Sequence, residues 1–206
     1  MDKFHYYMFN KPCGCVTARK DDKHTTVMDY FKELDNDKLS PVGRLDKETE
    51  GLLIITDDGQ FNQRMTNPEY KKDKIYEFIV FGNVDDNTKN RLEEGVILNN
   101  SDIMTSPAKV EIIYRTDFAH LQYIKKDMPS VLLEKIKANR PDNPVTMGKI
   151  TITEGRKRQV RRMFRTVGCY VIYLKRIQID NIVIDEKLKP GEWKEIKITN
   201  IDKQNV

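Results

Sequence analysis

The longest aliphatic run of this chain is Leu52–Ile55, and this shortness limits what the chain can fold into. A membrane-spanning helix needs about 20 apolar residues, and the first residues lack the apolar stretch of a secretory signal. With 38% hydrophobic and 33% charged residues, the core must be assembled from short apolar segments beneath a charged surface. We therefore expect a soluble, cytoplasmic protein whose 206 residues form one full domain or two lobes that share a core.

Many short segments have the composition and alternation of strands, with Gly, Pro, Asn and Asp between them. We predict strands at residues 6–9, 41–45, 52–56, 74–82, 108–114, 118–125, 148–153, 170–179 and 188–198. Lys11, at the bend after the first strand, is expected to be exposed. Asp57-Asp58-Gly59 is a strong tight-turn signal.

Helical periodicity is found in fewer segments. We predict helices at 23–34, with Thr25 or Thr26 as N-cap, at 60–68, ended by Pro68, and at 85–98, ended by Gly95. Because strands and helices do not alternate regularly, the chain is predicted to have an α+β fold with a mixed, largely antiparallel sheet. Residues 125–148 differ in composition and contain a possible helix at 130–139; we interpret them as an insertion between two strands.

The segment 154–168 carries the strongest local charge. Six Lys or Arg residues and no acid lie between Arg156 and Arg165, whereas the whole chain has a net charge of only +4. At about 100° per residue, Val160, Met163, Phe164 and Val167 share one helix face and Arg158, Arg162 and Arg165 the opposite one. Arg161 falls at the boundary, and Gly168 is the predicted C-cap. Such a patch is typical of a polynucleotide-binding face; an ordinary solvated helix face is the alternative.

Asp46 lies between two predicted strands, in the sequence GRLDKETEGLLIIT. A carboxylate can act as a covalent nucleophile, and a nearby guanidinium favours its ionised form. Arg44 supplies a cation in the same loop, Thr49 could hydrogen-bond within it, and Gly51 allows close approach of the backbone. The alternative is an Asp that merely caps backbone donors in a turn.

Other catalytic arrangements are not visible in the sequence. It contains no Gly-rich phosphate loop, no GxSxG and no HExxH motif. The three cysteines form no CxxC pair and the three histidines are scattered, so neither a disulfide framework nor a zinc site is predicted.

Several motifs, in a fixed order, resemble those of a known family. GRLDKETEGLLIITDDG is similar to the signature GRLDxxTxGLLLLTNDG of the Rsu-type ribosomal RNA pseudouridine synthases, and FNKP, KIYEFIV, EGRKRQVRRMF and LKPGEW occur in the order found in that family. The resemblance covers nearly the whole chain. It implies a two-lobed α+β catalytic domain with a central cleft, which isomerises uridine in RNA without a cofactor.

The resemblance also implies roles for individual residues. Asp46 matches the nucleophile, although whether it attacks the base or the sugar is left open. Tyr76 matches the tyrosine that stacks on the uracil and assists proton removal from C5. Arg161 matches the basic residue that pairs with the nucleophile.

RNA contacts are expected around these residues. A uracil within folded RNA must be flipped out, at a cost of a few kcal/mol, and Arg44 is expected to occupy the gap that it leaves. Binding of the RNA backbone is expected from Lys11, Arg156, Arg158, Arg162 and Arg165.

The branch of the family is less clear from the motifs. Because FNKP already starts at Phe9, we expect the small RNA-binding module with which many members begin to be absent. Together with the insertion and RKRQVRRM, this favours the E-type branch, whose members modify large-subunit RNA; Arg158, where many relatives have His, also occurs in members that act on that RNA. DDKHTTV and TDDGQ resemble the branch that modifies small-subunit RNA, which is the second interpretation.

The expected partner is ribosomal RNA or a ribosomal subunit assembly intermediate, and we expect a monomer. A protein of another class, an RNA-binding ribosome-assembly factor without catalysis, is the alternative function. An RNA hydrolase is a third possibility, but no catalytic set for hydrolysis is visible.

Overall fold

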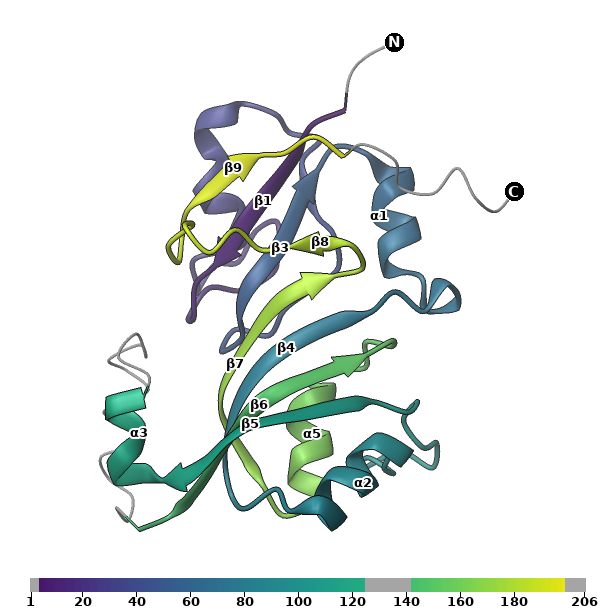
Figure 1. Ribbon diagram of the computed structural model, residues 1–206. Helices are drawn as coiled ribbons and strands as arrows, with labels where there is room; N and C mark the ends of the chain where they lie inside the picture. Colours follow the sequence, from purple (N-terminus) through teal and green to yellow (C-terminus); the bar gives the residue numbers. More distant parts are fainter. Residues whose placement is uncertain (1–3, 125–141, 199–206) are drawn as a thin grey trace. The chain divides into compact units, whose positions relative to one another are not determined.

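The computed structural model describes residues 4–124 and 142–198, which form two compact units (Figure 1). Unit 1 contains residues 4–70 and 183–198, so the last described segment returns to the unit in which the chain begins. Unit 2 contains residues 71–124 and 142–182. No helix among these residues is long and apolar enough to cross a membrane.

Unit 1 is built on antiparallel strands in the order β3–β1–β9, with β2 also paired to β3. Its elements are β1 (Tyr6–Lys11), the 3-10 helix η1 (Val27–Leu34), β2 (Ser40–Pro41), β3 (Glu50–Thr56), α1 (Gly59–Thr66), the 3-10 helix η2 (Pro68–Tyr70) and β9 (Trp193–Glu195). β8 (Ile182–Val183) lies at the boundary of the two units. The register places Lys11, the last residue of β1, opposite Gly51 at the start of β3.

The core of unit 1 follows from the predicted apolar segments. Every residue of β3 is buried, and the ring of Phe31 on η1 lies 5.4 Å from that of Phe9 on β1. The predicted N-cap of the helix at 23–34 is confirmed: the Thr26 backbone N–H donates to the Asp29 carboxylate at 2.7 Å, which is half of a capping box.

Three predictions for unit 1 are wrong. The predicted strand 188–198 is too long, because β9 covers only Trp193–Glu195. The segment 41–45 is not a strand, because β2 ends at Pro41 and a loop follows. Asp57-Asp58-Gly59 does not form the predicted tight turn. Instead, Asp58 is the N-cap of α1 and accepts a hydrogen bond from the Phe61 N–H at 2.9 Å, because a buried carboxylate can satisfy one of the donors at the start of a helix.

Unit 2 contains an antiparallel sheet with the strand order β5–β6–β4–β7. Its elements are β4 (Lys74–Phe81), α2 (Asp86–Glu94), β5 (Lys109–Asp117), α3 (Phe118–Ile124), β6 (Pro144–Ile152), α5 (Gln159–Thr166) and β7 (Tyr170–Ile179). The basic helix α5 is anchored to β4 through Phe164 and Phe78, whose ring centroids are 4.6 Å apart. Figure 1 shows α2 beside one end of β5 and α3 at the other end. The predicted α+β class with a largely antiparallel sheet is confirmed.

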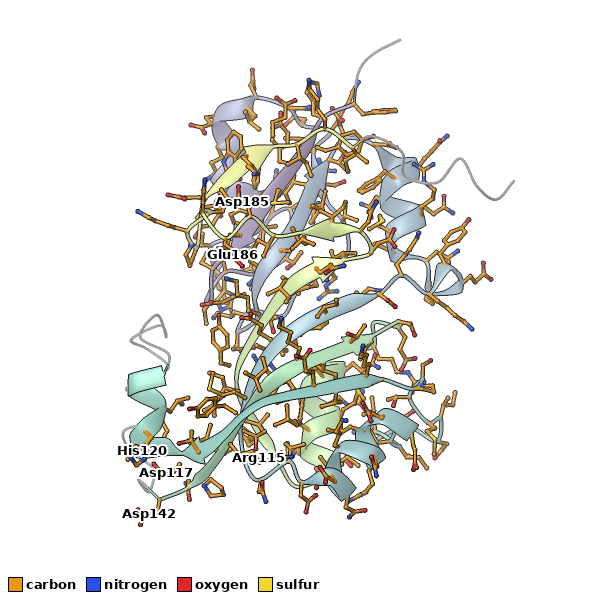
Figure 2. The ribbon with its side chains drawn as sticks, in the orientation of Figure 1. Arg115, Asp117, His120, Asp142, Asp185 and Glu186 are labelled. Carbon is orange, nitrogen blue, oxygen red and sulfur yellow. The ribbon has the colours of Figure 1, made fainter. Side chains whose placement is uncertain are left out.

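The segment after β5 differs from the prediction, because residues 118–124 form the helix α3 and not a strand. Asp117 accepts from the His120 backbone N–H at 3.0 Å, and Figure 2 shows the two residues together at the start of the helix. Leu121 is fully buried against Ile79 and Val145.

The predicted insertion is also too long. Residues 144–148, included in it, belong to β6, whereas the possible helix at 130–139 lies outside the described residues.

Candidate functional site

Asp46 lies in unit 1, in the loop between β2 and β3 (residues 42–49, the Asp46 loop). Asp46 is half-buried, while the neighbouring Leu45 is buried and Arg44 is exposed. The Thr49 N–H donates to the Asp46 carbonyl at 3.0 Å and closes a turn around the two residues between them. Asp46 therefore stands at the start of a tight turn, with buried residues on both sides of that turn.

A second segment of unit 1, residues 12–17, is hydrogen-bonded to this turn. The Thr17 hydroxyl donates to the Leu45 carbonyl at 2.8 Å and accepts from the Leu45 N–H at 3.1 Å. The Gly14 N–H donates to the Lys47 carbonyl at 2.8 Å. Both neighbours of Asp46 in the chain are thus fixed through their backbone, which limits the positions that the carboxylate can adopt.

The Lys11 side chain also hydrogen-bonds to the Asp46 loop. Its ammonium donates to the carbonyls of Thr49 at 2.9 Å, Pro12 at 3.0 Å and Lys47 at 3.4 Å. The three donors of an ammonium group thus meet three backbone acceptors, one of which, the Lys47 carbonyl, also accepts from the Gly14 N–H.

The prediction that Lys11 is exposed is wrong, because its relative exposure is 0%. A side chain without accessible surface cannot contact RNA, so the expected role of Lys11 in RNA binding is replaced by one in positioning the Asp46 loop. Burial lowers the pKa of the Lys11 ammonium, and the carboxylates of Glu50 and Asp46 are among the groups that oppose this shift.

Tyr76 lies in unit 2 on β4, where it is buried between neighbouring strands. The register places it opposite Ile150 on β6 and Arg176 on β7. Lys74 precedes it by two residues and therefore lies on the same face of the sheet. Burial lowers the pKa of Lys74, and the nearby charge of Arg176 lowers it further. The surroundings of Tyr76 thus combine apolar contacts with two largely buried cations.

Arg161 lies on α5, which is shorter than predicted. The helix begins at Gln159, so Arg156–Arg158 precede it, and Arg158 is the N-cap in a left-handed conformation with φ 53°. The predicted end at Gly168 is confirmed, since Gly168 has φ 82° and its N–H donates to the Arg165 carbonyl at 3.1 Å. A guanidinium nitrogen of Arg161 donates to the Val171 carbonyl on β7 at 3.2 Å.

Arg161 and Tyr76 are brought to one side of the same sheet. Phe78 lies on the same face of β4 as Tyr76 and packs against Phe164 of α5. The helix that carries Arg161 therefore covers the face that carries Tyr76.

The remaining predicted RNA-binding residues of unit 2 divide into two groups. Arg158 and Arg165 are exposed. Arg156 and Arg162 instead donate to backbone carbonyls of residues 99–104, Arg156 to Ile103 at 2.8 Å and to Met104 at 2.7 Å. These two arginines thus hold a neighbouring loop.

Sequence reasoning missed three residues at these sites. Thr17 carries no local signal, because a hydroxyl that clamps a distant backbone is visible only in the fold. Lys74 and Arg176 could have been noticed, since each is a cation within an otherwise strand-like segment. No group of His, Cys, Asp or Glu that could hold a metal ion occurs in the two described ranges.

Comparison with known proteins identifies a protein family that matches this chain. A profile of the protein family described as RNA pseudouridylate synthase matches residues 5–166. This range includes Asp46, Tyr76 and Arg161.

Individual relatives agree with the profile. The chain is 32% identical over 203 residues to the "Ribosomal small subunit pseudouridine synthase A" of Haemophilus influenzae, covering 98% of this chain and 75% of the relative. It is 36% identical over 189 residues to the protein of the same name from Salmonella typhimurium, covering 92% and 69%. A solved structure described as "Crystal structure of pseudouridylate synthase" superposes with a TM-score of 0.75 at 32% identity, covering 96% of this chain and 72% of that one.

Proposed function

The chain belongs to the RNA pseudouridylate synthase family, and from this we propose that it isomerises a uridine of small-subunit ribosomal RNA to pseudouridine. The observation that carries the proposal is that the family match spans Asp46, Tyr76 and Arg161 together. Because ribosomal RNA is the substrate, we expect the protein to act in the cytoplasm.

The choice of the small ribosomal subunit rests on the relatives. Both curated relatives described above are named as synthases of the ribosomal small subunit, whereas the sequence motifs favour the branch that modifies large-subunit RNA. Whole-chain similarity compares many more positions than a short basic motif and a single Arg in place of His. We therefore prefer small-subunit ribosomal RNA as the substrate, which is the second interpretation of the sequence motifs.

In the proposed reaction Asp46 is the nucleophile. The loop bonds from Thr17, Gly14 and Lys11 would hold its carboxylate in one position, and holding a reacting group in place can contribute several kcal/mol to catalysis. Exposed Arg44, two residues away, would occupy the gap left by the flipped nucleotide.

Unit 2 would supply the other two groups. Tyr76 would stack on the uracil and assist removal of the C5 proton. By the family resemblance, Arg161 would be the basic partner of the nucleophile, because a guanidinium stabilises a neighbouring anion.

Release of tritium tests this assignment. Small-subunit rRNA labelled at uridine C5 is incubated with the wild-type chain, with Asp46→Asn and with the matched control Asp37→Asn, which changes an exposed Asp of the same unit. We expect release by the wild type and the control, and none by Asp46→Asn, although this variant still binds RNA.

Two outcomes would change the proposal. Full release by Asp46→Asn would remove Asp46 from the nucleophile role. Binding of RNA by the wild type without any release from either ribosomal RNA would indicate a non-catalytic assembly factor.

A further inference from the structure

The loop between α2 and β5, residues 95–108, presents apolar side chains to solvent. Ile97, Ile103 and Met104 are 54%, 69% and 53% exposed, respectively. Ile97 and Met104 are paired in an antiparallel bridge, so these residues lie together at the outer part of the loop. We call Ile97, Ile103 and Met104 the apolar tip.

The loop is anchored at its base. Thr105 and Val96, both buried, exchange bonds: the Val96 N–H donates to the Thr105 hydroxyl at 3.0 Å and the Thr105 N–H to the Val96 carbonyl at 2.9 Å. Gly95 has φ 103°, and a side chain at this position would collide with the Thr105 carbonyl. The apolar tip is therefore held outward by a defined backbone.

Arg156 connects this loop to the basic segment. Besides its bonds to the carbonyls of Ile103 and Met104, its Nε donates to the Glu154 carboxylate at 3.2 Å. The same carboxylate accepts from the Ser106 N–H at 3.0 Å and from the Gln159 amide at 2.6 Å. Arg162 adds a bond to the Asn99 carbonyl.

The result is an apolar surface beside a cationic one. Lys157 and Arg158 follow Arg156 directly and are exposed, as is Arg165 on α5. Within the sequence of the loop, residues 95–108, Asp102 is the single acidic residue. RNA combines an anionic backbone with the apolar faces of unstacked bases, so it fits both parts of this surface, whereas a purely apolar partner would match only the apolar tip.

We propose that the apolar tip packs against an unstacked nucleotide of the substrate RNA while Lys157 and Arg158 bind the adjacent phosphates. Arg156 is the positioning residue that fixes the apolar tip relative to the exposed cations Lys157 and Arg158. The inference rests on the proposed function, since it identifies a contact for the same RNA substrate. It also assigns Arg156 and Arg162 a role different from direct binding of phosphate.

Removal of the apolar tip tests the contact. The double variant Ile103→Ser/Met104→Ser is compared with Ile113→Ser/Tyr114→Ser, which changes two apolar residues on β5 that are 54% and 52% exposed. Affinity for a small-subunit rRNA transcript is measured at several salt concentrations in the Asp46→Asn background, so that the substrate is not consumed. Thermal unfolding verifies that each variant is folded.

We expect the tip variant to bind about tenfold more weakly, as expected for the loss of a few tens of Å² of apolar contact per side chain, with an unchanged salt dependence, because no phosphate contact is lost. The β5 control should bind like its parent. Equal affinities of tip variant and parent would overturn the proposal. So would a defect seen only with assembled subunits and not with naked RNA, which would assign the tip to a ribosomal protein.

A charge-preserving substitution tests the role of Arg156. Arg156→Lys keeps the cation but loses the planar fork that reaches two carbonyls and a carboxylate. Positioning predicts a loss of affinity similar to that of the tip variant, whereas direct phosphate binding predicts almost none. Arg165→Lys, at an exposed site, is the matched control and should bind normally.

The test of the apolar tip and the test of the proposed function can fail independently of each other. If the wild type releases no tritium from RNA but the tip variant still loses affinity, only the catalytic assignment fails. If the wild type is active and the tip variant binds normally, only the present inference fails.

Discussion

The Asp46 loop of unit 1 and the 95–108 loop of unit 2 are each held by a cation, but they present different groups. Lys11 is fully buried and donates to three carbonyls around a carboxylate-bearing turn. Arg156 is partly exposed and donates to two carbonyls behind an apolar tip. The comparison shows that basic residues of an RNA-binding protein can serve the protein's own backbone, so that counting charges overestimates the number of phosphate contacts.

The two cations should therefore affect different measurements. Lys11 should control the stability of unit 1 and the rate of the chemical step, because it donates to carbonyls of the loop that carries the proposed nucleophile. Arg156 should control RNA affinity, because its loop carries a proposed binding surface. The following predictions test this distinction.

The largest effect is expected from Lys11→Met. The Thr49 carbonyl would lose its ammonium donor, and a buried acceptor without a partner costs roughly 1–3 kcal/mol. The Lys47 carbonyl keeps the bond from the Gly14 N–H, and removal of a buried charge offsets part of the loss. We expect the free energy of unfolding to fall by about 2 kcal/mol and kcat to fall more than RNA affinity. Urea unfolding and tritium-release kinetics measure both, with exposed Lys38→Met as control. Weaker RNA binding with unchanged stability would restore Lys11 as an RNA contact.

Thr17→Val should have a smaller effect on stability but a clear effect on rate. The substitution keeps the shape of the side chain and removes both bonds to Leu45. We expect kcat to fall about tenfold, because small displacements of a reacting group are costly, with KM nearly unchanged. Thr17→Ser retains the hydroxyl and should restore most of the rate. If serine and valine behave alike, the hydroxyl does not position Asp46.

The pH dependence of stability should also distinguish Lys11 from the exposed cations. Burial lowers its pKa below the ordinary 10.5, so the unfolded chain binds more protons between the two values. Stability relative to Lys11→Met should therefore rise with pH across that window, and the cost of the buried charge is fully present below it. Urea unfolding at a series of alkaline pH values measures the difference. If the free energy of unfolding of the wild type relative to Lys11→Met stays constant or falls as the pH rises, Lys11 is not a buried ammonium.

The smallest effect is expected from Arg165→Ala. Its side chain is exposed on α5, so its loss should remove about one phosphate contact. RNA affinity should fall a few-fold and the slope of log affinity against log salt should decrease by about 1. An unchanged slope with unchanged affinity would place Arg165 outside the RNA-binding surface.

The sequence predicts those elements whose signals are local. β7 coincides with the predicted strand 170–179, and the Thr26 cap lies where Thr and Asp three residues apart indicate it. Segment 118–124 resembles a strand because its apolar residues also suit a strand. Asp117 before Phe118 and Leu121 is the neglected signal, since an Asp followed by apolar residues at helical spacing is typical of a helix start.

The site is predictable in its residue types but not in its geometry. Asp46 and its signature stand in the sequence, whereas the inward direction of Lys11 depends on carbonyls of Lys47 and Thr49 that only the fold brings near. A Lys followed by Pro and Gly suggests an exposed bend, and nothing local shows that distant acceptors need its ammonium. The same holds for Arg156, whose carbonyl partners Ile103 and Met104 lie more than 50 residues earlier in the chain.

The account is tested most directly by mapping pseudouridines in ribosomal RNA from cells with and without the gene. We predict that one pseudouridine of the small-subunit RNA disappears on deletion, that the wild-type chain restores it, and that Asp46→Asn does not. Retention of every small-subunit pseudouridine in the deleted strain, or restoration by Asp46→Asn, would contradict the account.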